Sequence, residues 1–240
     1  MLPDQALTNT YPVHGVSKAA EVYRSITRYL SASYVIPTAK RTMCSVPQHA
    51  NLHLLAEQVL AFGVPGDLVE LGCYAGDTTR TIAKAWQQLG MHRGLHVYDD
   101  FKFDPKGMGD VREQFIASFA QSGLTLPTIH MGDLHSMLHD ELPEKIAFAH
   151  IDLGFEEEPR LIAQLVRKSL ENIYPRMTPG SVCVLMDYHD PTRTLQGWDC
   201  SPGVKLACDR FFADKQEKMQ VLFGGEYSHG FFRRLPTNMA

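Results

Sequence analysis

The spacing of hydrophobic and polar positions changes along this chain of 240 residues. Over residues 17–34 and 51–62, apolar side chains recur every three or four positions, which predicts two amphipathic helices. From residue 67 onward, short apolar runs alternate with longer amphipathic segments. This alternation predicts a mostly parallel β-sheet with helices on both faces.

The expected elements can be placed by residue range. The predicted strands are residues 67–71, 94–98, 127–131, 146–153 and 181–187, and the predicted helices are residues 77–89, 111–122, 159–173 and 202–214. Two more apolar runs, 219–223 and 230–235, predict a C-terminal antiparallel hairpin, with His229 in its solvated turn. We therefore expect a helical arm or cap over residues 1–50 and one α/β domain over residues 51–240.

Composition narrows the class of protein. The chain is 44% hydrophobic and 21% charged, as in ordinary globular domains. Its net charge is −4 and it has no long basic run, which argues against a nucleic-acid partner or an anionic membrane surface. No stretch reaches the roughly 18 apolar residues of a membrane span. The five cysteines show no zinc spacing, and the first 20 residues lack a signal peptide's apolar core, so we expect a reduced, cytoplasmic protein.

A glycine loop follows the first predicted strand, from Gly72 to Gly76. In an open α/β sheet, ligands bind beyond the carboxyl ends of the strands, and glycine lets the backbone approach them closely. A dinucleotide site would need further glycines where Tyr74 and Asp77 stand, and Asp77 would place a carboxylate against the phosphates. S-adenosylmethionine has no phosphate and carries a cationic sulfonium, so this loop favours it over a dinucleotide.

Acidic residues at three strand ends support the same cofactor. Asp99 follows the next strand, roughly 20 residues after Asp77, where a carboxylate can accept the ribose hydroxyls. Asp133 follows the third strand and can accept the adenine amine, and Glu70 can lie near the amino-acid portion. The predicted cofactor-binding residues are Glu70, Gly72, Cys73, Tyr74, Gly76, Thr78, Asp99, Asp100, Gly132, Asp133 and Asp152. The alternative reading of each acid taken singly is a helix cap or a solvated turn residue.

The sequence resembles the macrocin O-methyltransferase family of class I S-adenosylmethionine-dependent enzymes. The resemblance covers about residues 40–235. It is carried by Thr42-Met43, Gly63-Val64-Pro65-Gly66-Asp67-Leu68-Val69-Glu70, Tyr98-Asp99-Asp100-Phe101, Ile151-Asp152, the run from Tyr174 to Gly180, Met186-Asp187-Tyr188 and the run from Ser201 to Lys205. It implies a Rossmann-like α/β methyltransferase fold that ends in an antiparallel hairpin.

The resemblance also implies a reaction, which is methyl transfer to a hydroxyl of a small, natural-product-like acceptor, assisted by Mg²⁺. In the family, acids at the ends of the fourth and fifth strands hold the metal. Here Gly154 and Met186 replace two of those acids, which leaves Asp152 and Asp187 as metal ligands, with Glu156, Glu157 or Glu158 able to complete the set. Because Mg²⁺ requires hard oxygen ligands, the sequence favours chemistry without metal.

Without a metal, a general base must take the proton of the acceptor hydroxyl. His189 follows the fifth predicted strand, and Asp187 or Asp190 can orient its ring. Histidine is the side chain type whose ordinary charge change falls near neutral pH. We therefore predict His189 and Asp187 as the catalytic residues. His150, inside the fourth strand, is expected to be a packed strand residue.

Two other functions stay open at this point. The loss of two family acids is compatible with a non-catalytic protein that binds S-adenosylmethionine, and with an enzyme that uses the sulfonium for a reaction other than methyl transfer. The sequence leaves open the identity of the acceptor and whether the chain forms a homo-oligomer.

Overall fold

The structure is a computed structural model, and it describes residues 43–105, 107, 109–153, 158–193, 199–224 and 228–236, without the side chain of His135. These residues fall within one of the two compact units of the chain, Thr42–Ala240. The predicted helix over residues 17–34 lies outside the described residues. The predicted division at residue 50 stays a prediction.

A sheet of seven strands forms the centre of this unit, in the order β3-β2-β1-β4-β5-β7-β6. The strands are β1 (Asp67–Leu71), β2 (Leu95–Asp99), β3 (Thr128–Met131), β4 (Ile146–Ile151), β5 (Met177–Leu185), β6 (Gln220–Leu222) and β7 (His229–Arg233). Strands β1 to β5 are parallel, whereas β7 runs antiparallel to both β5 and β6. This order confirms the predicted Rossmann-like methyltransferase fold with a C-terminal antiparallel hairpin.

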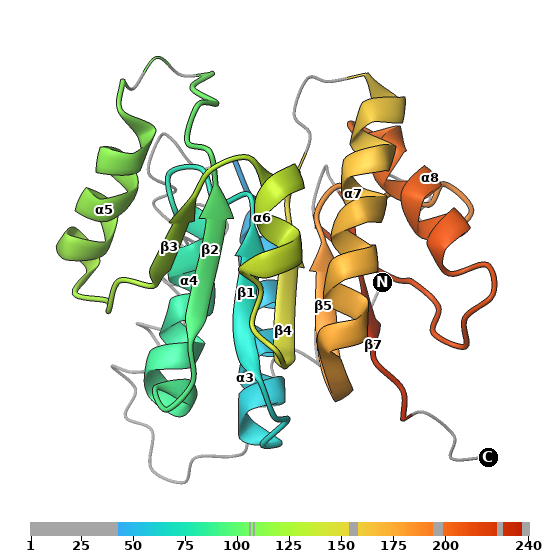
Figure 1. Cartoon of the computed structure of the whole chain (residues 1–240), viewed down its shortest axis with the longest axis horizontal. Coiled ribbons are helices and arrows are strands. Elements are labelled where there is room, and N and C mark those ends of the chain that lie inside the picture. The colour runs from blue at the N-terminus through green and yellow to red at the C-terminus, as the bar shows by residue number, and fades with distance from the viewer. Residues whose placement is uncertain are drawn as a thin grey trace, which may run out of the picture. The chain divides into compact units, whose positions relative to one another are not determined.

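Helices cover both faces of the sheet (Figure 1). They are α3 (Val46–Ala61), α4 (Asp77–Ala85), α5 (Val111–Ser122), α6 (Leu134–Asp140), α7 (Pro159–Ile173) and α8 (Pro202–Phe211), with a π-helical turn at Trp86–Gly90 and a 3₁₀ turn at Tyr174–Arg176. In the view of Figure 1, α6, α7 and α8 lie in front of the sheet, and α3 and α4 lie behind it. None of the helices in the described part of the chain is long and apolar enough to cross a membrane.

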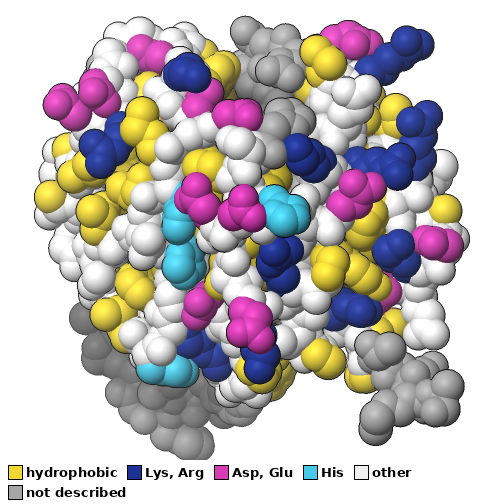
Figure 2. Space-filling view, viewed as in Figure 1, with side chains coloured by type: hydrophobic (Ala, Val, Ile, Leu, Met, Phe, Trp, Pro, Cys, Tyr) yellow, Lys and Arg dark blue, Asp and Glu magenta, His cyan; other side chains and the backbone are white. Residues whose placement is uncertain are grey.

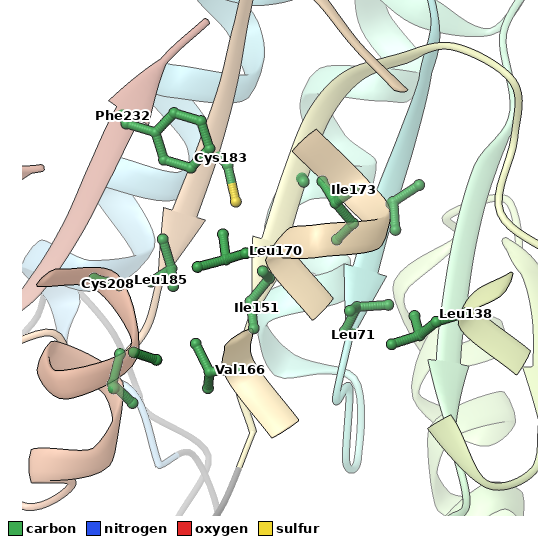
Figure 3. Packing of buried hydrophobic residues seen from close by; sticks show 14 of the residues in the cluster. Leu71, Leu138, Ile151, Val166, Leu170, Ile173, Cys183, Leu185, Cys208 and Phe232 are labelled. Carbon is green, nitrogen blue, oxygen red and sulfur yellow. The ribbon is translucent and has the colours of Figure 1, made fainter. Parts of the chain in front are cut away.

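Two hydrophobic cores, one on each face, hold these layers together. In front, Leu71, Ile151 and Leu185 from the strands pack against Val166 and Leu170 of α7 (Figure 3). Behind, the core joins buried residues of β1, β2, β4 and β5 to α3, α4 and α5. All six residues of β4 are buried, as expected for a central parallel strand covered on both faces.

Local signals explain where α3 begins and ends. Ser45 and Gln48 form a reciprocal capping box, in which each side chain bonds the other residue's backbone N–H. The chain leaves the helix at Gly63, whose φ is +66°. The helix therefore begins five residues before the predicted start at Asn51, because the capping signal precedes the apolar repeat.

Three sequence-based placements were wrong. Helix α6 was not predicted, because its few apolar residues lie in a short polar segment. Strand β5 begins at Met177 and not at residue 181. His229 lies in β7 with no exposed surface, and not in a solvated turn, because β7 packs under α3.

Candidate active site

A cavity of about 670 Å³ opens at the carboxyl ends of the parallel strands. Its wall combines acidic, apolar and thiol side chains from seven chain segments. The lining residues are Met43, Cys44, Gly72, Cys73, Tyr74, Asp77, Thr78, Asp99, Asp100, Lys102, Phe103, Gly132, Asp133, Leu134, Asp152, Leu153, Leu161, Gln164, Leu165 and Asp187. This volume is within the range of small-molecule and cofactor sites.

The glycine loop between β1 and α4 forms one wall of the cavity. Gly72 has a φ of +77°, and a Cβ placed there would lie 1.9 Å from the main-chain oxygen of Asp152. Gly76 has a φ of +86° and precedes α4, where a Cβ would meet the Phe115 ring at 2.8 Å. Both glycines are therefore required by the packing of the protein itself. The sequence analysis explained Gly72 only by close approach of the backbone to the cofactor, and that explanation was incomplete. Gly76 does not line the cavity.

Asp99 fixes the conformation of this loop from the end of β2. One carboxylate oxygen accepts the backbone N–H groups of Cys73 and Tyr74, at 2.7 and 2.9 Å. The other accepts the N–H of Phe101 at 2.7 Å. These bonds stabilise Tyr74 and Phe101 in left-handed conformations, with φ of 46° and 56°. A carboxylate has about four lone-pair sites, so Asp99 keeps acceptor capacity toward the cavity.

The ends of β2 and β3 supply the next part of the wall. Asp100 forms an ion pair at 3.5 Å with Lys102, whose side chain is exposed, whereas the Asp100 side chain is partly buried. Asp133 precedes α6, and its main-chain oxygen accepts the N–H groups of Ser136 and Met137 in that helix. The predicted residues Asp100, Gly132 and Asp133 thus lie on one wall together with Leu134.

Two carboxylates, Asp152 and Asp187, lie at the inner end of the cavity. Burial and then the Asp187 charge raise the pKa of Asp152 to about 7. Burial likewise raises the pKa of Asp187, against a hydrogen bond donated by the Cys200 thiol. Asp187 has a φ of 58°, a conformation that Asp and Asn tolerate better than other residues with a side chain. An acidic side chain whose pKa lies close to neutral can both accept and release a proton.

Glu70 does not line the cavity, although the sequence placed it next to the cofactor. It points from β1 toward the α3 side of the sheet, and its carboxylate meets the His150 ring at 2.8 Å. Both side chains have no exposed surface, so the prediction that His150 is a packed strand residue is confirmed. Within the described structure, the second Glu70 oxygen and the Nε2 of His150 have no hydrogen-bond partner.

His189, the predicted base, is not among the described residues that line the cavity. Its ring is buried, and its Nδ1 lies 2.7 Å from the Ser228 hydroxyl, which precedes β7. The left-handed turn at Asp187 directs that carboxylate to the cavity, and the chain then carries His189 toward the C-terminal hairpin. Of the two predicted catalytic residues, the structure brings only Asp187 to the cavity.

Among the described residues, two carboxylates at the strand ends could bind a metal ion. Asp152 and Asp187 are the carboxylates at the two strand ends, whereas residues 154–157 are outside the described part of the chain. Met186 is buried on the other side of the strand, where its sulfur lies 3.9 Å from the Gln48 amide nitrogen. No group of three or more metal-binding side chains occurs among the described residues. The side chains present therefore match an Mg²⁺ site only in part.

Several cavity residues were not predicted from the sequence. Met43 and Cys44 precede α3, and Phe103 follows β2 in a loop. Leu161, Gln164 and Leu165 come from the first turns of α7. Their spacing of three and four residues places them on one face of that helix, and this spacing is the sequence pattern from which they could have been predicted as cavity residues.

Comparisons with known proteins agree with this geometry. Residues 69–188 match a family model described as "Methyltransferase domain". An 8-demethyl-8-(2,3-dimethoxy-α-L-rhamnosyl)-tetracenomycin-C 4'-O-methyltransferase of Streptomyces olivaceus is 28% identical over 178 residues. The match covers 63% of this chain and 64% of that protein, so the chain spans less than two thirds of the relative's length.

Solved structures share the fold at low identity. The O-methyltransferase NovP superimposes with a TM-score of 0.60 at 19% identity, over 80% of this chain and 81% of NovP. A TDP-rhamnose 3'-O-methyltransferase of calicheamicin biosynthesis gives 0.55 at 19% identity, over 91% and 95% of the two chains. An S-adenosylhomocysteine-bound methyltransferase of Podospora anserina gives 0.53 at 16% identity, over 93% and 90%.

Proposed function

The chain belongs to the methyltransferase domain family, whose model matches half of its length, and we propose that it is an S-adenosylmethionine-dependent O-methyltransferase. The observation that supports this most directly is the cavity at the strand ends, where the Asp152 and Asp187 carboxylates meet the glycine loop. The closer assignment to the macrocin family stays a prediction from the sequence.

The described wall fits the proposed cofactor. We assign Asp99 to the ribose hydroxyls and Asp133 to the adenine amine, and this assignment is supported by the position of both residues in the cavity wall. Leu134 and Phe103 supply apolar surface for the adenine ring. The backbone of Gly72 and Cys73 would lie along the methionine portion. Glu70 would act indirectly, because it is bonded to His150 beneath the loop.

When bound, S-adenosylmethionine supplies a methyl group on a cationic sulfur for attack by an acceptor oxygen. The protein must align that oxygen and take up its proton. We assign the proton uptake to the Asp152–Asp187 pair in place of His189. Asp187 is the acceptor of the proton, and Asp152, with its pKa raised to about 7, shares it. The proton therefore moves from the acceptor hydroxyl to a carboxylate oxygen.

We further propose that the reaction does not require Mg²⁺. Support comes from Met186, which occupies the position of a family acid and packs against Gln48 on the far side of β5. The test is turnover after treatment with EDTA. Unchanged turnover is expected, and a loss restored by Mg²⁺ but not by Ca²⁺ would contradict the proposal.

The two relatives whose names specify a sugar methylate rhamnose hydroxyls. We accordingly propose a sugar hydroxyl of a small natural-product-like molecule as the methyl acceptor. The direct experiment incubates the protein and S-adenosylmethionine with rhamnose-bearing acceptors and follows S-adenosylhomocysteine release and the mass of the product. One added methyl group per acceptor is expected. Tight cofactor binding without turnover of any acceptor would favour the non-catalytic alternative.

The remaining expectations concern the protein's location in the cell, its partners and its oligomeric state. A cytoplasmic location and the absence of nucleic-acid and membrane partners stay predictions, and the sequence leaves open whether the chain forms a homo-oligomer. Size-exclusion chromatography with light scattering measures the last of these directly.

A further inference from the structure

We propose that His96 and His130 form a binding site for a divalent transition-metal cation such as Zn²⁺, separate from the cavity at the strand ends. Neither histidine lines that cavity. His96 belongs to β2 and His130 to β3, the strand at one edge of the sheet. The Nδ1 of His96 lies 3.2 Å from the Nε2 of His130, so each ring presents one nitrogen to the space between them.

The register of the sheet brings the two rings together. Strands β2 and β3 are parallel, and His130 is paired with Tyr98, two residues after His96. Side chains two residues apart point to the same face of a strand, so both histidines lie on the face that carries the Tyr98 ring. That ring stacks on His130, with centroids 4.3 Å apart and planes 8° apart. A Cβ at Gly94 would lie 2.3 Å from the Nε2 of His96, so the glycine leaves room for this ring.

A carboxylate lies at the outer nitrogen of each ring. Glu141, which follows α6, places an oxygen 2.9 Å from the Nδ1 of His130. Asp67 of β1 places one at a longer distance, 3.5 Å, from the Nε2 of His96, while its other oxygen accepts the N–H of Gly94. Histidines that bind metals commonly donate their second N–H to a carboxylate, which fixes the tautomer and directs the other lone pair to the metal. This arrangement is present on both sides of the pair.

The two carboxylates decide which nitrogens carry lone pairs. A neutral imidazole has one N–H, and an ionised carboxylate accepts hydrogen bonds without donating any. With the outer nitrogens donating to Asp67 and Glu141, both inner nitrogens carry lone pairs that face each other at 3.2 Å. Because two lone pairs repel at this distance, a cation must lie between the rings, and that cation is either a proton or a metal ion.

The distance and the surroundings of the pair fit a metal ion. Two nitrogens bound to one tetrahedral Zn²⁺ at about 2.0–2.1 Å lie about 3.3 Å apart, close to the 3.2 Å observed. Imidazole suits Zn²⁺, Cu²⁺ and Ni²⁺, whereas Mg²⁺ prefers oxygen ligands. The side chains of His96 and His130 are 21% and 18% exposed, so water molecules can complete the coordination from the solvent side. Figure 2 shows histidine side chains next to acidic ones on this face, over β2 and β3 as they lie in Figure 1.

A cation at this place would cross-link the edge strand to the rest of the sheet. Strand β3 pairs with β2 alone, and Gly132 and Asp133, which directly follow β3, line the cavity. A ligand that binds the folded chain and not the unfolded chain stabilises the fold. We therefore expect Zn²⁺ to raise the midpoint of thermal unfolding of the full chain.

Calorimetric titration of the EDTA-treated and dialysed full chain with Zn²⁺ tests the site directly. His96→Phe and His130→Phe each replace one imidazole with a ring, and each is expected to weaken Zn²⁺ binding by at least about tenfold. His139→Phe is the matched control, because His139 also has a carboxylate neighbour, Asp140, at 2.6 Å, but no second histidine bonded to it in the described structure. This variant is expected to bind Zn²⁺ as the wild type does.

A second variant tests the site without removing an imidazole. The Glu141 side chain is 46% exposed, so Glu141→Ala is expected to fold. It removes the acceptor that fixes the tautomer of His130, and Zn²⁺ affinity is expected to fall by about tenfold. Thermal unfolding of every variant with and without Zn²⁺ provides the second measurement. The rise in midpoint should be kept in His139→Phe and lost in His96→Phe and His130→Phe.

The outcomes distinguish a metal ion from a shared proton. A proton between the rings would leave the wild type binding Zn²⁺ no more tightly than His96→Phe and His130→Phe, and this result would overturn the proposal. Binding that survives in both histidine variants but disappears after alkylation of the cysteines would place the ion at thiols and would also contradict it. None of these measurements requires S-adenosylmethionine or an acceptor, so a failure of the proposed function would not affect them.

Discussion

The carboxylate of Glu70 and the imidazole of His150 meet at 2.8 Å across β1 and β4, in a region with no access to solvent. Each partner compensates the cost of burying the other. The pair lies directly beneath the glycine loop, since Glu70 is two residues before Gly72.

The first prediction concerns this pair. Glu70→Leu and His150→Phe each leave one polar partner buried and unpaired, so each is expected to reduce the free energy of unfolding by about 3–5 kcal/mol. The double variant replaces both partners with apolar groups and is expected to cost about 2 kcal/mol less than the sum of the two. Urea denaturation of the four proteins measures this, and additive losses would show that the two side chains are not coupled.

The second prediction concerns Gly72. Gly72→Ala places a Cβ 1.9 Å from the main-chain oxygen of Asp152, so the unfolding free energy is expected to fall by about 3 kcal/mol or more. Gly63→Ala is the matched control, because Gly63 has a similar φ of +66° with no atom near its added Cβ. There a cost of about 1 kcal/mol is expected from the backbone alone. Equal losses in the two variants would contradict the close contact with Asp152.

The third prediction separates the two candidate bases. Asp187→Asn keeps a side chain that tolerates a φ of 58° and removes the proton acceptor, so kcat is expected to fall about a hundredfold or more. His189→Gln is expected to lower kcat less than about tenfold, because the ring is turned toward Ser228. Calorimetry should find S-adenosylmethionine affinity nearly unchanged in both. A greater loss for His189→Gln would return the role of base to that residue.

The fourth prediction is a dependence of stability on pH. Burial and the Asp187 charge raise the pKa of Asp152 to about 7, above its value in an unfolded chain, about 4. Between these values the folded protein retains a proton that the unfolded chain has lost, so Asp152 lowers stability increasingly as pH rises through this window. Asp152→Asn removes that cost.

This variant is therefore expected to exceed the wild type in stability, with a gain that grows from pH 4 to pH 8 to on the order of 1–3 kcal/mol. Urea denaturation at both pH values provides the measurement. Asp100→Asn, which changes a partly exposed acid of the same cavity, serves as the control and should show no such growth. A gain that is the same at both pH values would exclude a raised pKa for Asp152 as its cause.

The sequence located most of the cavity wall because its signals are local. The glycine loop, Asp99 and Asp133 each follow a short apolar strand, and the carboxyl ends of parallel strands meet at one edge of the sheet. Nine of the eleven predicted cofactor residues line the cavity, and Glu70 and Gly76 do not. Glu70 points to the α3 side of the sheet, where it meets His150. Side chains alternate between the two faces along a strand, and the sequence does not specify which face a given residue of β1 takes.

The inner end of the cavity, where we propose the proton acceptor, could not be predicted from the sequence in the same way. The distinction between Asp187 and His189 depends on the left-handed backbone at Asp187, which directs one side chain to the cavity and leaves the other against Ser228. Ser228 is 39 residues away in the chain, so no local pattern predicts this contact.

The sequence by itself determined the α/β fold class, the glycine loop and the acids at the strand ends, because periodicity and turn chemistry are properties of neighbouring residues. Only the tertiary structure decided that Gly72 lies against Asp152, that Glu70 pairs with His150 and that one face of α7 lines the cavity. Those relationships join segments that are about 80 or more residues apart in the chain, or set the face of an element, and the packing of helices on both sides of the sheet fixes them.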